Sequence, residues 1–435
     1  MTPLSREFYI GWFLGLACLA AFTVCPNVNM PNGDVSGWVW WLDAYASAEG
    51  SMLKVTGDPP EGLRHQRLSP EEIEQLGQRE GNAGWWVLWH PHHLLYLPVT
   101  AFIYRIVAWF VPVFGAVTFL QYWNAFASAG TIMLLYFLLT RIVPRSVFII
   151  PWCLFLVSSV TFFHYATDGS QYPTPIFFMM IACGGLWAFS QRGDPKLLLR
   201  SAFWLALAIL FHQIVSIIVP FLLIGVFFII RGMKKAKVRF SWGWLWLAGL
   251  IALGVPVLVY VLIAYFALGP TGEFNIPGLW KYATLFAHQP EYWTESARQG
   301  ILDNLLTFIG FYFGIDVTRQ LFLKGIWFTA LAVILPAIWF TGIYKIREME
   351  AYTRWWMFMC LLWILPLLVF LSFWNPGHDF YHLFLTIPLS CIAVIGAETS
   401  RTTGKRPLTD VVLFWVWCLI AIYVNLPASL AGCER

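Results

Sequence analysis

RSAFWLALAILFHQIVSIIVPFLLIGVFFII, residues 200–230, is an apolar run that His212-Gln213 interrupts near its middle. A membrane-spanning helix needs about 20 apolar residues, so this run is long for one span and short for two. Polar side chains are costly in lipid, and the pair must face protein or a water-filled cavity. The simpler alternative is a histidine that bonds a neighbouring backbone carbonyl. We expect two short helices that meet near His212.

The composition indicates a membrane protein with many spans. Of its 435 residues, 59% are hydrophobic and 11% are charged, against roughly 45–50% and 25% in ordinary globular proteins. The net charge is only +4, and the cations lie in short separated clusters, which fits cytoplasmic loops and argues against a nucleic-acid partner. Six cysteines fall within apolar runs, where a thiol is a small buried hydrophobe: Cys18, Cys153, Cys183, Cys360, Cys391 and Cys418.

The basic residues set the predicted topology, because cytoplasmic loops carry an excess of Lys and Arg. All basic loops lie on one side of the membrane only if residues 94–114 and 303–315 do not cross it and residues 200–230 cross it twice. Arg105 and two prolines weaken the first as a span, and the second has about half the required length. We therefore expect about eleven spans, with the amino terminus inside and the carboxyl terminus outside. The basic loops are 141–145, 192–200, 231–239, 345–354 and 401–406.

The predicted fold class is an all-α polytopic membrane protein with juxtamembrane or re-entrant helices on its outer face. The run 9–25 follows Arg6 and predicts a first span, with a cleaved signal peptide as the alternative. In both cases the next segment of the chain is exported. We expect two parts: a membrane module over 1–268, which includes the first exported loop 26–93, and variable carboxyl-terminal helices over 269–435, which include the outer loop 269–302.

The first exported loop carries an acid, Asp34, just after the Asn32-Gly33 turn signal. Apolar residues from Ser36 to Glu49 recur at helical spacing, which predicts an amphipathic helix at the membrane surface. Asp34 has two interpretations, a helix N-cap or a carboxylate aimed at a cleft. Asp43 lies on the more polar side of the helix and is expected to be solvated.

Histidines and further acids gather on the same predicted face. A divalent metal site is conceivable, but no H-x-x-x-H or paired Cys/His spacing concentrates ligands on one helix. We therefore assign no metal ligands and no cofactor. The segments are WHPHHLLY at 89–96, TFFHYATDGSQYP at 161–173 with an outer loop expected over 164–171, and SFWNPGHDFYHLFLTIP at 372–388.

The order of these motifs resembles the GT-C superfamily of integral-membrane glycosyltransferases, and is most similar to its protein O-mannosyltransferase-like branch. An acid near a glycine (Asp34 to Gly37) is followed by a His-Pro segment that enters an apolar helix (His90 to Tyr96). Three further segments match in order: 124–130, 162–172 and Leu210-Phe211-His212-Gln213 with Pro220. Together they cover about the first 230 residues, whereas the second half matches only in general character.

The sequence also departs from the family pattern. Val35 and Ser36 separate Asp34 from Gly37, His92 replaces the second proline of the family's His-Pro-Pro, and the acid of the second outer loop is Asp168. These departures leave the predicted fold intact and leave the donor, the acceptor and any metal requirement open.

The resemblance implies a polyprenyl-phosphate-linked sugar as donor, an active site on the extracytoplasmic face and inversion at the sugar carbon. A glycan, a lipid or a protein is the acceptor, and the bilayer is the other partner. An inverting transfer needs a carboxylate to accept the acceptor's proton, and donors or cations to stabilise the leaving phosphate. Asp34 is the first candidate base and Asp168 the second. Candidate phosphate or acceptor binders are His90, His93, Arg105, Tyr172, His212, His378 and His382, whereas His92 is expected to face the headgroups.

Two alternatives remain open at this point. A transporter or flippase for a lipid-linked or anionic solute would also bury His and Asp, although transporters commonly show internal repeats, and none is evident between the halves. A non-catalytic scaffold with a GT-C fold is the other alternative.

The predicted location is the bacterial inner (plasma) membrane, with the active site on the periplasmic side.

Overall fold

The computed structural model describes residues 3–24, 42, 91–111, 115–235, 240–268, 274–284, 293–294, 296–313, 344–374, 378–403 and 407–430. Within these ranges the chain is almost entirely helical and holds no β-strand, only an isolated bridge between Trp293 and Trp374. The predicted all-α class is confirmed. Asp34, His90, the predicted helix of the first exported loop and the apolar run at 322–344 lie outside the described residues, apart from Leu42 and Tyr344.

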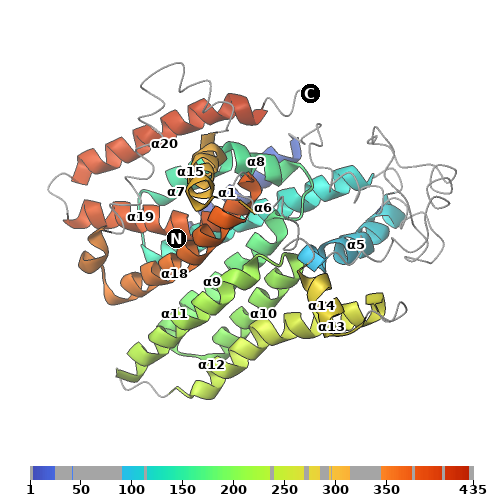
Figure 1. The fold of residues 1–435 in the computed structure, drawn as a ribbon. Coiled ribbons are helices and arrows are strands. Elements are labelled where there is room, and N and C mark those ends of the chain that lie inside the picture. Colours follow the sequence, from blue (N-terminus) through green and yellow to red (C-terminus); the bar gives the residue numbers. More distant parts are fainter. Residues whose placement is uncertain are drawn as a thin grey trace.

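The described helices can be followed by label in Figure 1. Seven of them are long and apolar enough to cross a membrane, or up to eight if the bent pair α7–α8 is one span. The protein is therefore an integral, multi-pass membrane protein, and the predicted count of about eleven spans is not confirmed. The helices are α1 (Pro3–Val24), α5 (Tyr96–Phe110), α6 (Ala116–Ile142), α7 (Ile149–Ser158), α8 (Val160–Thr167), α9 (Pro173–Arg192), α10 (Pro195–Phe211), α11 (Val215–Lys235), α12 (Trp242–Gly249), the π-helix η2 (Leu250–Gly254), α13 (Val255–Leu268), α14 (Ile276–Ala283), α15 (Ala297–Phe313), α18 (Ala351–Phe373), α19 (Thr386–Thr403) and α20 (Pro407–Leu430), with short 3-10 turns η1 (Pro91–His93), η6 (Lys345–Glu348) and η7 (Asp379–Leu385).

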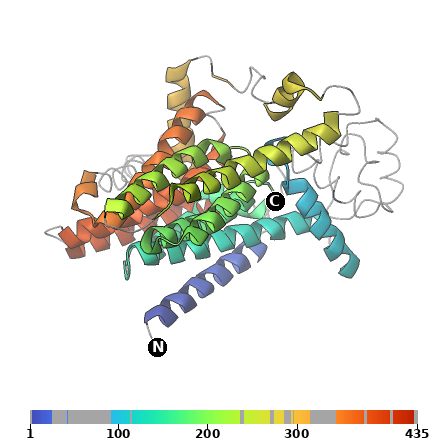
Figure 2. The ribbon, with the colours of Figure 1, turned by 90° about the horizontal axis from the view of Figure 1, so that it is seen from below.

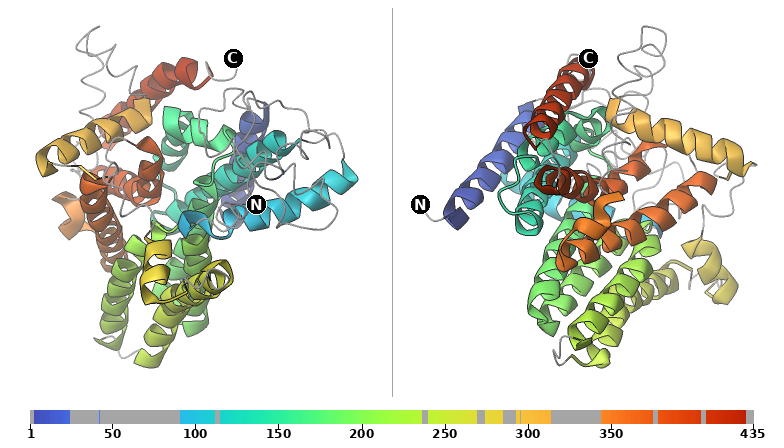
Figure 3. Two further views of the ribbon diagram at one scale, coloured as in Figure 1. Left: turned by 45° about the vertical axis from the view of Figure 1, so that its right-hand side comes forward. Right: turned by 90° about the vertical axis from the view of Figure 1, so that its left-hand side faces the viewer.

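The long run at 200–230 divides as predicted. Helix α10 ends at Phe211 and α11 begins at Val215. His212 adopts an extended backbone (φ −158°, ψ 120°), and its Nδ1 accepts the backbone N–H of Ile214 at 3.2 Å. The histidine thus caps a helix break by accepting a backbone N–H. Helices α9 to α13 lie side by side at one end of the molecule (Figures 1 and 3).

The two segments predicted not to cross form short helices. Helix α5 has 15 residues and α15 has 17, so they extend about 22 Å and 26 Å, less than the roughly 30 Å of a bilayer's hydrocarbon core. Helix α5 buries one face against α6 and exposes Phe102, Ile106 and Trp109 on the other. Leu42 is buried in the same apolar cluster as α5.

The predicted loop at 164–171 is shorter than expected. Helix α8 continues to Thr167, so His164 is helical and the connection to α9 comprises residues 168–172. The preceding span is bent by 66° between α7 and α8, where Ser159 has an extended backbone.

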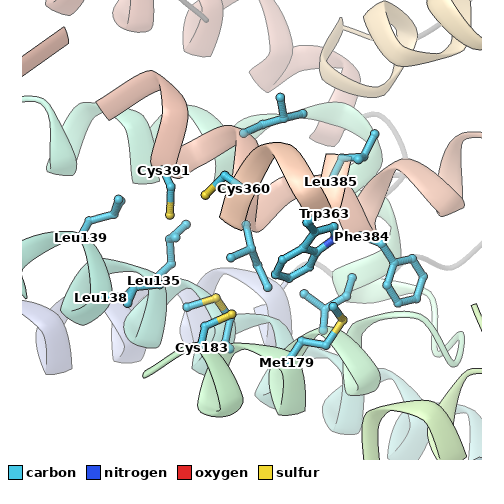
Figure 4. Close-up of a cluster of buried hydrophobic side chains, with 14 of the residues drawn as sticks. Leu135, Leu138, Leu139, Met179, Cys183, Cys360, Trp363, Phe384, Leu385 and Cys391 are labelled. Atoms are coloured by element: carbon cyan, nitrogen blue, oxygen red, sulfur yellow. The ribbon is translucent and has the colours of Figure 1, made fainter. Parts of the chain in front are cut away.

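The core lies where α6, α9, α18 and α19 meet. Leu135 and Leu138 of α6 face Met179 and Cys183 of α9, with Trp363 of α18 close by (Figure 4). The six cysteines predicted to be buried are buried free thiols. In the most apolar part of the segment containing α19, 89% of the residues are buried, whereas the share in α1 is 28%. Helix α1 lies at the edge of the molecule (Figure 2). Helices from both 1–268 and 269–435 share this core, and the division into two parts stays a prediction.

Candidate functional site

The turn at His212 is surrounded by rings from several elements. The His212 side chain is 3% exposed, and the end of η1, the loop before α9 and the turn η7 all reach it. Its ring centroid lies 5.3 Å from that of Tyr172, 5.4 Å from Phe384, 6.2 Å from His93, 6.2 Å from Tyr381 and 6.4 Å from His92. The structure thus brings together three of the predicted binders, His93, Tyr172 and His212.

The His-Pro segment is tied to this turn through its backbone. The N–H of Gln213 donates to the carbonyl of His92 at 2.7 Å, and the N–H of Leu95 donates to the carbonyl of Leu210 at 2.9 Å. The turn η1 is therefore joined to the α10–α11 break, although the two are more than a hundred residues apart in sequence.

The loop 168–172 is a second polar region, and helices α5 and α6 hold it. The Asn124 amide of α6 donates to the carbonyls of Ser170 at 2.6 Å and Tyr165 at 3.2 Å. The Tyr96 hydroxyl of α5 donates to the carbonyl of Gly169 at 2.8 Å. Gly169 has a φ of +88°, and a Cβ there would lie 3.0 Å from the Leu120 Cβ, so the tight approach to α6 requires glycine.

Asp168 is buried within this loop. Its side chain accepts the N–H of Ser170 at 2.8 Å through Oδ1, and Oδ2 faces Nε2 of His164 at 3.8 Å without accepting a hydrogen bond from the described residues. Burial raises the pKa of the Asp168 carboxyl from 3.8 to about 6, against the opposing effects of His164 and of the hydrogen bonds from Ser170 and Asn124. The pKa rises because a desolvated carboxylate is disfavoured.

A cavity of about 230 Å³ opens beside His212. The α10–α11 turn, helices α11, α14 and α18, the turns η1 and η7 and the segment around Trp293 form its walls. Its polar lining residues are His92, His212, Gln213, Ser216, Thr284 and Tyr381. His92 also lines this cavity, and its position relative to the headgroups stays a prediction. Asp168 is not among the lining residues and is 1% exposed.

One apolar cavity adjoins this one, and a second adjoins the first. The first, of about 360 Å³, shares Gln213, Ser216 and Ala283 with it and runs between α10, α13 and α14. The second, of about 750 Å³, shares Leu253 with the first and lies between α11 and the α12–η2 segment. Side chains exposed at the surface line both apolar cavities in part, Val257 and Trp280 in the first and Trp246 and Leu250 in the second.

The remaining predicted binders lie elsewhere. His382 is buried, and its Nε2 is hydrogen-bonded to Oδ1 of Asn304 at 2.8 Å, which joins η7 to α15. His378 is exposed against Phe380, and Arg105 is on the exposed side of α5. None of the three lines the cavity. No group of three or more His, Cys, Asp or Glu side chains within the described ranges is arranged to hold a metal ion.

Sequence reasoning assigned no role to several residues that build the site. Asn124 occurs in one of the segments that resemble the family, and this is the only feature of the sequence that points to it as part of the site. Tyr96 ends the His-Pro segment that resembles the family, and Tyr381 lies within the histidine-rich segment 372–388, but the sequence predicts no role for either. Gln213 was singled out with His212 as a polar pair within an apolar run.

Comparisons with known proteins bear on the fold. No protein-family model and no curated protein matches the chain. A solved structure of the archaeal oligosaccharyltransferase AglB from Archaeoglobus fulgidus, in complex with an inhibitory peptide and a dolichol-phosphate, matches with a TM-score of 0.50. The chain has a GT-C-like fold. Sequence identity is 11%, and the match covers 97% of this chain but 56% of AglB, so the chain spans little more than half the length of that protein. Its placement in the O-mannosyltransferase-like branch stays a prediction.

Proposed function

We propose that this protein is a GT-C glycosyltransferase that moves a sugar, with inversion, from a polyprenyl-phosphate-linked donor to an acceptor on the extracytoplasmic face. The observation that carries the proposal is that two cavities adjoin: the one beside His212, with His92, His212 and Gln213 in its lining, shares Gln213, Ser216 and Ala283 with an apolar cavity. A polyprenyl phosphate has the same order of chemistry, a charged head on a long apolar chain. The O-mannosyltransferase-like branch and a bacterial inner membrane with a cytoplasmic amino terminus belong to the same proposal.

The histidines that line the cavity beside His212 suit a phosphate. Because Nδ1 of His212 accepts the N–H of Ile214, the proton of its neutral ring is on Nε2, which makes that atom a donor. The Gln213 amide donates one N–H to the carbonyl of Ala283 at 2.9 Å, which fixes its orientation at the junction of the two cavities. Hydrogen bonds to a charged phosphate are stronger than neutral ones and gain further strength as charge develops on the leaving group.

The apolar cavities suit the lipid chain. The first is lined by Leu253, Val257 and Tyr260 on one side and by Leu279 and Trp280 of α14 on the other. Val257 and Trp280 are also exposed at the surface. A lipid chain can therefore enter this cavity from the side without passing through the cavity beside His212. The structurally similar AglB is in complex with a dolichol-phosphate, which supports a lipid-phosphate ligand for this fold.

Asp34 is the proposed base and Asp168 is the second candidate. In the transfer, the acceptor hydroxyl forms a bond to the sugar carbon, the bond to the phosphate oxygen breaks, and the acceptor's proton passes to a carboxylate. Asp34 belongs to the exported loop whose carboxyl-terminal end, at His92, lines the cavity. Asp168 is buried, and its loop neighbour Tyr172 contacts His212. A base must reach the acceptor, which favours Asp34 over Asp168.

The test is transfer of labelled sugar from a polyprenyl-phosphate donor to acceptors in a membrane extract, catalysed by the purified full-length protein in lipid nanodiscs. Asp34→Asn is expected to lower the rate by about 100-fold or more, the usual contribution of a general base. Asp43→Asn, in the same loop, is the matched control and is expected to retain the rate. A wild-type rate for Asp34→Asn would remove Asp34 as the base. Failure of the wild type to release polyprenyl phosphate would favour the flippase or scaffold alternative.

A further inference from the structure

The cavity beside His212 has an aromatic end that the phosphate and the lipid chain do not use. Trp293, Phe370 and Trp374 line it. Trp293 is 42% exposed and Trp374 is 5% exposed. Their ring centroids lie 5.1 Å apart at an interplanar angle of 83°, so the edge of one indole meets the face of the other.

Tyr381 connects this end to the histidines. Its ring lies 6.2 Å from that of His212, and its hydroxyl accepts the indole N–H of Trp374 at 3.5 Å. The aromatic pair therefore lies one side chain beyond the proposed phosphate position.

The backbone holds Trp293 in place. Trp293 and Trp374 form an antiparallel bridge, and the N–H of Thr294 donates to the carbonyl of Phe373 at 3.0 Å. A Cβ at Gly300 would overlap the carbonyl of Ser372, so the start of α15 packs directly on the end of α18. An exposed ring on such a fixed segment is pre-organised for a ligand.

A sugar ring matches this end of the cavity. A pyranose carries hydroxyls around its rim and partly positive C–H bonds on its faces, and an aromatic face carries the complementary negative quadrupole. Hydroxyl groups for the rim are present in the same cavity, on Thr284, Ser216 and Tyr381.

We propose that Trp293, supported edge-on by Trp374, is the binding platform for the sugar ring of the lipid-linked donor. This inference rests on the proposed function and adds the place of the sugar to it. The donor then lies along the cavities in the order of its own bonds: chain in the apolar space beside α13 and α14, phosphate at His212, and hexose against Trp293.

The experiment measures binding to the full-length protein in nanodiscs. The probes are a polyprenyl phosphate and the same lipid carrying glucose, mannose or galactose. The wild type is expected to bind at least one sugar-bearing lipid about two- to ten-fold more tightly than the bare phosphate, the range of one aromatic contact. Trp293→Ala is expected to abolish this difference while it leaves the affinity for bare polyprenyl phosphate unchanged, and Trp293→Phe is expected to retain part of it.

Two further variants complete the design. Trp280→Ala, in the apolar cavity, is expected to weaken all probes equally and so to keep the ratio between them. Trp293→Leu fills the space without an aromatic face. It is expected to bind the sugar-bearing lipid no more tightly than the bare phosphate, and it replaces Trp293→Ala as the test if that variant fails to fold. The role of Trp293 would be overturned, and the proposed function left standing, by either of two results. One is a Trp293→Leu variant that keeps the wild-type preference for the sugar-bearing lipid, and the other is a wild type that binds all probes equally. A wild type that binds none of the probes would overturn the proposed function as well.

Discussion

The loop 168–172 and the cavity beside His212 are neighbouring polar regions that are built in opposite ways. The loop is closed: Asn124 and Tyr96 donate to its carbonyls, and its acid is buried. The cavity is open, and its two histidines, His92 and His212, line a space that adjoins an apolar cavity. Tyr172, which ends the loop and contacts His212, joins the two. The closed region can hold the open one in shape, and the open one has room for a ligand.

The largest expected effect comes from removing the imidazole at the open region. His212→Ala takes away a donor to the leaving phosphate and is expected to lower sugar transfer by about 100-fold or more, as for other donors to developing charge. His378→Ala, whose ring is exposed and outside the cavity lining, is the matched control and is expected to change transfer little. Equal losses in the two variants would remove the distinction between the cavity and the rest of the described surface.

The next effect concerns the acid of the closed region. Because burial raises the pKa of Asp168 to about 6, the folded state favours the neutral carboxyl. The contribution of the neutral Asp168 carboxyl to the free energy of unfolding is fully present below about pH 4 and is lost as the pH rises through 6. A shift of this size corresponds to about 3 kcal/mol. Asp168→Asn is expected to lose this pH dependence, measured as thermal unfolding between pH 4 and 7. Parallel curves for wild type and variant would show that Asp168 does not titrate as described.

The smallest expected effect concerns the support of the loop. Asn124→Leu keeps a similar shape and removes the donor to the carbonyls of Tyr165 and Ser170. Leaving buried carbonyls without a donor costs about 2 kcal/mol. Unfolding should therefore occur at lower temperature, and Thr140→Val, in the same helix, is the control because its hydroxyl bonds only within its own turn. An unchanged unfolding temperature for Asn124→Leu would mean that the loop is held by other contacts.

The sequence predicted the features that local patterns determine. The break at His212 arises from a polar pair inside a run too long for one helix, and the short helices α5 and α15 arise from charge, proline and length. The burial of the cysteines reflects the apolar runs around them. These features depend on residues close together in the chain.

The parts of the site that it missed depend on packing between distant segments. Asn124 and the Ser170 carbonyl are 46 positions apart, and the regular apolar pattern of α6 gives no sign of that partner. Trp293 and Trp374 meet only because α15 packs on the end of α18. The carboxylate of Asp168 was predicted as a second base, but its burial depends on α5 and α6 closing over the loop.

The most direct test of the account is the position of a polyprenyl phosphate bound to the full-length protein, determined as density in an electron cryo-microscopy structure. The account predicts the phosphate within hydrogen-bond distance of Nε2 of His212, and the chain in the apolar cavity beside Leu253 and Val257. A phosphate bound at the loop 168–172, or a chain that leaves the apolar cavities empty, would contradict it.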